Sequence, residues 1–160
     1  MPVELLEGDF EALVRRLGGE LLKFDKPVRT VGEAVEASKA SLGQVVKSIP
    51  FMAGEGPVLV VVDGESRVDL DRLSGILGPV KPATAMEVEE ITGFKVGAVP
   101  PIGVKVRAIM DPKVLENKYV IGGGGDVDKL LIIDPRKILE YQRAEVLDVK
   151  KTETMKEGKR

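Results

Sequence analysis

The sequence predicts an α/β domain of the α+β type, with a mixed and largely antiparallel sheet surrounded by short helices. Its 160 residues are the length of one ordinary domain, and its 43% apolar content is not concentrated in any long apolar run. Short β-type runs bounded by glycine and proline alternate with short segments that have helical spacing. We therefore expect a single domain over residues 1–150, followed by a charged, frayed tail over 151–160.

The first part of the chain predicts a helix, a strand and a second helix. Apolar residues over 5–17 recur at spacings of three and four, as on one face of a helix. The apolar stretch 20–24 precedes a proline and predicts a strand. Thr30 and Glu33 form a capping box, which predicts a helix over about 31–40.

The middle of the chain predicts a β-hairpin followed by two short helices. Residues 44–52 are rich in β-branched side chains, and residues 57–62 are almost wholly apolar, as in a strand buried on both faces. The glycine-containing linker 53–56 has the length of a hairpin loop. Helical spacing and N-capping residues then predict helices over 69–77 and 84–93.

The last third predicts the rest of the sheet. Three β-type runs occupy residues 104–110, 118–121 and 129–133, separated by Asp-Pro and glycine-rich turns. A helix beginning at Asp134-Pro135 and a final strand over 145–149 complete the expected order.

Composition excludes several classes of function. The chain has no cysteine and no histidine, so it has no disulfide, thiolate nucleophile, Ser-His-Asp triad or His-ligated metal. Its 24 basic and 26 acidic side chains lack the surplus of a nonspecific nucleic-acid binder, although a local basic site stays open. Neither a membrane span nor a secretory signal is visible, which predicts a cytoplasmic protein.

Lys47 is a candidate functional residue because it stands inside an apolar β run. By strand alternation it shares a face with Val45 and Ile49. Its ammonium group therefore lies either at a solvated sheet edge, where lysine discourages aggregation, or in a pocket.

Residues 92–103 form a second candidate, a loop with three glycines and two adjacent prolines. Such a backbone leaves N–H groups outside any ladder and can direct them at an oxyanion or phosphate. The alternative is a rigid turn between a helix and a strand.

Two other patterns are rejected, one as a P-loop and the other as a metal site. Residues 122–125 are all glycine but lack the Lys-Ser/Thr pair of a P-loop, which leaves a wide hairpin loop or a close backbone approach to a ligand. Asp63, Asp69 and Asp71 fall in a turn and at a helix start, where acidic caps are expected. We predict no metal and no cofactor.

Three separated segments resemble the YbaK/ProX family of aminoacyl-tRNA deacylases, which also occurs as the editing domain of many bacterial prolyl-tRNA synthetases. They are residues 30–48, 92–103 and 119–123, and the most specific motifs are Lys47-Ser48 and the G-x-x-x-P loop that starts at Gly97. The resemblance implies a mixed sheet that closes toward a barrel. It also implies a freestanding trans-editing hydrolase that removes Ala or Cys from tRNA(Pro), with the tRNA acceptor end and prolyl-tRNA synthetase as partners.

The resemblance also assigns roles to residues. Lys47 would hold the ester region or terminal phosphate, and backbone N–H groups near Gly97 would polarise the ester carbonyl. Pro100 and Ile121 replace residues that are small or polar in many relatives, and both would touch the amino-acid pocket. The implied substrate-binding residues are Thr30, Ser48, Ala98, Val99, Pro100, Pro101, Gly103, Ile121, Gly122 and Gly123.

Two other functions fit the same sequence. One is a non-catalytic module of this fold that binds a tRNA acceptor end or a nucleotide. The other is a protein–protein adaptor that uses residues 58–62 as a sheet edge.

Overall fold

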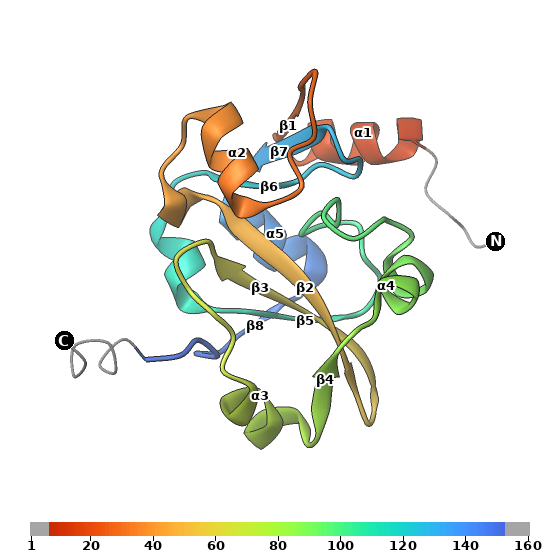
Figure 1. The fold of residues 1–160 in the computed structure, drawn as a ribbon, viewed down its shortest axis with the longest axis vertical. Coiled ribbons are helices and arrows are strands. Elements are labelled where there is room, and N and C mark those ends of the chain that lie inside the picture. The colour runs from red at the N-terminus through yellow and green to blue at the C-terminus, as the bar shows by residue number, and fades with distance from the viewer. Residues whose placement is uncertain (1–6, 153–160) are drawn as a thin grey trace.

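The computed structural model describes residues 7–152, which form two sheets with short helices around them (Figure 1). The smaller sheet has the order β1-β7-β6 and the larger one the order β4-β2-β3-β5-β8. Only the β3–β5 and β5–β8 pairs are parallel among the pairs of these strands, so the predicted mixed, largely antiparallel sheet is confirmed. The strands are β1 (Glu20–Lys23), β2 (Val46–Ala53), β3 (Gly56–Asp63), β4 (Val80–Pro82), β5 (Arg107–Met110), β6 (Val120–Gly123), β7 (Lys129–Ile133) and β8 (Glu145–Val146).

The two sheets meet at one end of β2 without closing into a barrel. A parallel bridge between Val45 and Ile121 joins the residue before β2 to β6. Beyond this point β2 and β6 separate, and β4 pairs with β2 only from Phe51 to Ala53. A stretch of β2 between the bridge and β4 therefore has an unpaired side.

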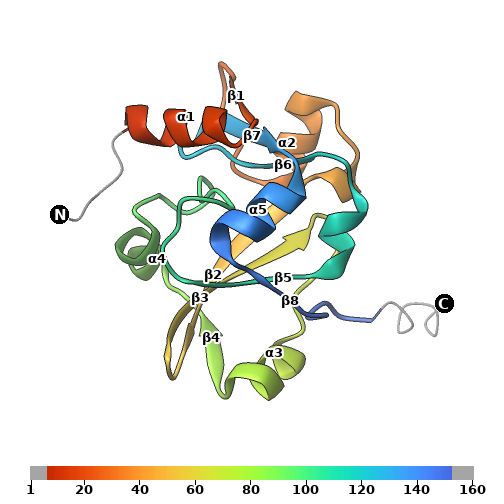
Figure 2. The same ribbon diagram turned by 180° about the vertical axis from the view of Figure 1, so that it is seen from behind.

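Short helices cover these sheets, and their starts follow the capping signals. Thr30 and Thr84 complete capping boxes with Glu33 and Glu87, and Asp69 caps its helix through its side chain. Seen from behind in Figure 2, α5 lies between the two sheets. The helices are α1 (Glu7–Arg16), α2 (Val31–Ser38), α3 (Leu70–Leu77), α4 (Ala85–Thr92) and α5 (Pro135–Gln142), with 3-10 turns at Leu42–Gln44 and Pro112–Glu116.

The predicted hairpin is confirmed as β2 and β3, which pair from Val46↔Asp63 to Ala53↔Gly56. Residues 58–63 are all buried, and the two faces of β3 serve two different cores. Leu59 and Val61 belong to one hydrophobic cluster, whereas Val58, Val60 and Val62 belong to another that includes Leu73 of α3.

This position of β3 overturns the adaptor hypothesis for residues 58–62. The strand is not an edge, because it lies between β2 and β5 in the larger sheet. Its main-chain groups are paired on both sides, so they cannot receive the strand of another protein.

The described residues begin within the predicted first helix and end within the predicted tail. Leu5 and Leu6 of the expected first helix lie outside the described residues, as do residues 153–160 of the tail. Fraying is wrong for the first tail residue, since the Lys151 N–H donates to the Arg67 carbonyl at 2.9 Å. Within residues 7–152, no helix has the length and apolar character required to cross a bilayer.

Candidate functional site

A cavity of about 440 Å³ opens along the unpaired stretch of β2. Its walls come from the loop before α2, from α4, from the turn at residues 96–99 and from β6. The floor is apolar and contains Ile121 and Leu130, two members of a hydrophobic cluster. The size and the apolar walls are those of a pocket for a small organic group.

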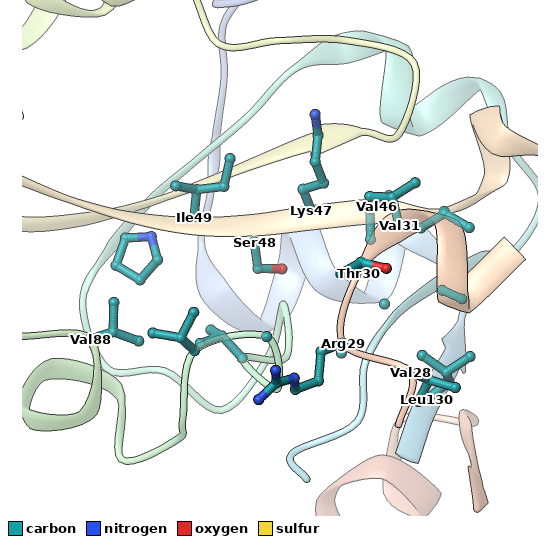
Figure 3. A pocket seen from close by; sticks show the side chains of 18 of the residues that line it. Val28, Arg29, Thr30, Val31, Val46, Lys47, Ser48, Ile49, Val88 and Leu130 are labelled. Carbon is teal, nitrogen blue, oxygen red and sulfur yellow. The ribbon is translucent and has the colours of Figure 1, made fainter. Parts of the chain in front are cut away.

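Strand alternation places Ser48 and Lys47 on opposite faces of β2. Ser48 is paired with Val61, whose face belongs to the cluster between the two sheets. Lys47 is paired with Val62, whose face packs against α3. Figure 3 shows the same division, with the two side chains leaving the strand in opposite directions.

The Ser48 hydroxyl is buried without a hydrogen-bond partner at the cavity. The main-chain N–H and C=O groups of Ser48 also point to the unpaired side of β2. In an antiparallel ladder, every second residue of a strand directs these groups to the same side. Pro50, two residues after Ser48, accepts from the Ala83 N–H on that side at 3.0 Å. Buried polar atoms are normally paired, so the unpartnered hydroxyl makes Ser48 a candidate residue for binding a ligand or water.

The Lys47 ammonium group is held on the other face. It donates to the main-chain carbonyl of Ser66. The hydroxyl of the same serine donates to the carboxylate of Asp63, which is fully buried. Burial lowers the pKa of Lys47; the Asp63 carboxylate opposes this shift and the Arg67 guanidinium adds to it. The solvated-edge interpretation is therefore wrong, while a contact between Lys47 and substrate stays a prediction that requires the ammonium to leave Ser66.

A tight turn brings Gly97 to the cavity opposite β2. The Ala98 N–H donates to the Lys95 carbonyl at 2.9 Å, and Gly97 has a φ of 87° that favours glycine. Within the part of the chain that the structure describes, neither the Gly97 nor the Val99 N–H donates to a protein acceptor. The predicted free N–H groups are thus present at the cavity wall.

The glycines of β6 are needed for close contact with this turn. A Cβ on Gly123 would overlap the Val99 carbonyl oxygen, and one on Gly122 would come within 3.2 Å of Pro101. The Gly125 N–H donates to the Ala98 carbonyl at 2.9 Å. Of the two interpretations of residues 122–125, the hairpin loop is confirmed. A close backbone approach also occurs, but to the main chain of Val99 and not to a ligand.

The predicted substrate-binding residues divide into two groups. Thr30, Ser48, Val99, Ile121, Gly122 and Gly123 line the cavity together with Lys47 and Gly97. The remaining four, which the structure does not place in its lining, are Ala98, Pro100, Pro101 and Gly103.

Packing separates three of these residues from the cavity. Pro101 packs behind Gly122, and Gly103 is next to Phe10 and Leu13 in the core. Pro100 is buried, so its expected contact with the amino-acid pocket is not found. Among those that do line the cavity, the Thr30 hydroxyl is already engaged, because it accepts from the Glu33 N–H at 3.0 Å.

Sequence reasoning missed Arg29, which lines the mouth of the cavity. In Figure 3 its side chain reaches from the loop before α2 on the Ser48 side of β2, opposite to Lys47. No described residue of the lining is acidic, and Arg29 is the charged lining residue whose side chain lies on the Ser48 side of β2. An isolated arginine in a loop carries no periodicity or motif that could have identified it.

Comparisons with known proteins show what this chain is similar to. A family model described as an aminoacyl-tRNA editing domain matches residues 25–141. The proline–tRNA ligase of Streptococcus equi subsp. zooepidemicus is 26% identical over 145 residues, which cover 87% of this chain and 24% of the ligase. The ligase of Lactobacillus gasseri is 34% identical over 114 residues, covering 68% of this chain and 20% of the ligase.

The chain thus matches only 24% of the length of the Streptococcus ligase and 20% of the length of the Lactobacillus ligase. A solved structure covers it more completely. A protein provisionally described as a trans-editing enzyme for prolyl tRNA synthetase superposes with a TM-score of 0.81 and 33% identity. The match covers 95% of this chain and 99% of that protein.

Proposed function

Because this chain belongs to the aminoacyl-tRNA editing domain family, we propose that it hydrolyses the ester of a mischarged aminoacyl-tRNA. The proposed substrates are Ala-tRNA(Pro) and Cys-tRNA(Pro), on which the chain would act in trans in the cytoplasm. The observation that carries the proposal is the buried, unpartnered Ser48 hydroxyl at an apolar cavity. Such a cavity accepts a small side chain, and the hydroxyl supplies a hydrogen bond to the group that carries it.

In the proposed mechanism, the ester lies between Ser48 and the turn at Gly97. The unpaired N–H groups of Gly97 and Val99 would donate to the carbonyl oxygen as negative charge develops on it. A base of the protein is not required at the ester. The attacking water, or a group of the substrate, would be activated by the terminal 2′-hydroxyl of the tRNA or by the amino-acid side chain, since the chain has no histidine or cysteine.

Ser48 acts in this proposal as a hydrogen-bonding residue and not as a nucleophile. A serine nucleophile needs an adjacent base, and the nearest lysine in sequence, Lys47, directs its ammonium to the opposite face. Lys47 would add positive potential near the acceptor end, which favours the ionised transition state.

A deacylation panel tests the proposed function. Purified chain is incubated with Ala-, Cys- and Ser-charged tRNA(Pro), with cognate Pro-tRNA(Pro) as the control, and the remaining ester is followed over time. We expect Ala-tRNA(Pro) or Cys-tRNA(Pro) to be deacylated much faster than in buffer, and the prolyl ester to be spared. Salt-dependent tRNA binding without turnover would instead indicate the non-catalytic module.

Replacing Lys47 with alanine is expected to reduce both activity and stability. Loss of the hydrogen bond to Ser66 should lower the free energy of unfolding by about 1 kcal/mol, and loss of the charge should slow deacylation by about tenfold or more. Thermal unfolding and single-turnover kinetics on one preparation measure both effects. A variant with wild-type turnover and lowered stability would show that Lys47 is only structural.

The Ile121→Ser variant tests where amino-acid selectivity lies. Ile121 is 8% exposed and forms part of the apolar wall, so a smaller polar side chain should enlarge the pocket and add a hydrogen-bonding group. Apolar pockets discriminate one methylene by about 1–3 kcal/mol, so we expect the ratio of Ala to Ser deacylation to change by about tenfold or more. An unchanged ratio would place the amino-acid side chain elsewhere in the cavity.

A further inference from the structure

We propose that Arg29 binds the phosphate on the 5′ side of the terminal nucleotide of the substrate. This inference rests on the proposed deacylase function and identifies a residue that positions the acceptor end. It assigns to Arg29 the phosphate contact that the sequence led us to expect of Lys47.

The main chain fixes the root of the Arg29 side chain. The Glu33 carboxylate accepts from the Arg29 N–H at 2.9 Å and from the Thr30 N–H at 3.1 Å. The preceding residue, Val28, is buried in the same hydrophobic cluster as Ile121 and Leu130. The Cα of Arg29 is therefore held at the start of α2, although its side chain is exposed.

Gly97 makes room for the aliphatic part of this side chain. A Cβ on Gly97 would lie 2.8 Å from the Arg29 Cβ, 3.2 Å from Cγ and 3.3 Å from Cδ. The stem of Arg29 therefore lies against the turn that contributes Gly97 and Val99 to the cavity lining. The absence of a side chain at Gly97 serves this contact in addition to the backbone conformation.

The guanidinium group of Arg29 is left available for an anion. Within residues 7–152 it forms no ion pair. Of the two carboxylates four residues away, Asp25 makes no ion pair with it, and Glu33 already accepts two main-chain N–H groups. No described residue that lines the cavity is acidic. An exposed arginine at the mouth of such a pocket has five donors without a charged acceptor, an arrangement that suits bidentate contact with a phosphate.

The chemistry of the acceptor end selects the phosphate as the partner. The ester, the ribose and the adenine are neutral, the α-ammonium is repelled by a guanidinium, and only the phosphates are negative. If the aminoacyl group enters the cavity below Ser48, the chain of the tRNA leaves through the mouth, where Arg29 lies (Figure 3). Lys47 is less suited to this contact, since its ammonium is bonded to Ser66 on the opposite face.

Two small probes test the assignment without depending on turnover. They are 3′-alanylamino-3′-deoxyadenosine, in which an amide replaces the ester, and the same compound with a 5′-phosphate. Calorimetric titration gives the ratio of their dissociation constants for each variant. We expect wild type to bind the phosphorylated probe about tenfold or more tightly, Arg29→Ala to bind both probes equally, and Arg29→Lys to retain part of the preference.

Lys26→Ala is the matched control, because it removes one positive charge from the same exposed connection but does not line the cavity. It should keep the wild-type preference. The assignment is overturned if wild type shows no preference for the phosphorylated probe. It is also overturned if Arg29→Ala keeps this preference, including the case in which both dissociation constants rise by the same factor. A preference that depends on Arg29 in a chain that does not deacylate charged tRNA would overturn the proposed function alone.

Discussion

Gly97→Ala is expected to slow deacylation on the order of a hundredfold, the usual cost of losing one oxyanion donor. The φ of 87° is unfavourable for alanine, so the turn should rotate and redirect its free N–H groups. The new Cβ would also lie 2.8 Å from the Arg29 Cβ and displace that side chain. We therefore expect tRNA affinity to fall as well, although by less than turnover.

A double-mutant cycle separates these two effects. Arg29→Ala keeps only the Cβ, so the double variant removes the Cγ and Cδ contacts and any phosphate contact that Gly97→Ala could disturb. The double variant should therefore lose less affinity than the product of the two single losses. Its chemical step should still be as slow as that of Gly97→Ala.

Gly93→Ala is the control for backbone strain alone. Its φ is 81°, close to that of Gly97, but a Cβ there meets nothing within 4 Å. It should reduce thermal stability at the end of α4 and leave the Michaelis constant unchanged. An equal loss of affinity in both glycine variants would show that the contact between Gly97 and Arg29 has no role in binding.

Gly123→Ala is expected to be the most destabilising single substitution considered. The added Cβ would overlap the Val99 carbonyl oxygen, a main-chain atom that cannot turn away as a flexible side chain does. The separation of β6 from the 98–101 segment should cost about 3 kcal/mol of unfolding free energy, at the upper end for overpacking. For a chain of this length this corresponds to a fall of about 10 °C in the thermal midpoint.

Gly54→Ala provides the comparison for this effect. Gly54 lies in the β2–β3 turn, where a Cβ meets no atom within 4 Å, so the midpoint should change by no more than about 2 °C. Calorimetry of the two variants beside wild type measures the difference. A Gly123→Ala protein as stable as Gly54→Ala would show that β6 does not pack this closely on the turn.

The parts of the fold that were predictable have local causes. A capping box satisfies N–H groups within four residues, which is why the starts of α2 and α4 follow directly from Thr30 and Thr84. The hairpin of β2 and β3 has two long β-branched strands and a short turn. By contrast, β4 has only three residues and ends with Pro82, so it carries no recognisable pattern and was missed.

The candidate site was only partly predictable because it depends on how distant segments meet. Alternation shows that Lys47 and Ser48 face opposite ways, but both faces of β2 are packed, and the sequence does not say which of them borders a cavity. The free N–H groups of Gly97 and Val99 agree with what the glycines and prolines of the loop predict. The approach of Arg29 to Gly97 joins residues 68 positions apart, and nothing in either segment signals it.

In the proposed function, the ester of a mischarged tRNA is hydrolysed in the cavity below Ser48. The most direct test is the single-turnover rate of alanine release from Ala-tRNA(Pro) by wild type, Ser48→Ala and Ser74→Ala, a control serine on α3 that does not line the cavity. We expect wild type and Ser74→Ala to release alanine at equal rates well above buffer hydrolysis, and Ser48→Ala to be about tenfold slower or more. Release by wild type at the buffer rate would rule out hydrolysis by this protein, and release by Ser48→Ala at the wild-type rate would rule out a role for the Ser48 hydroxyl.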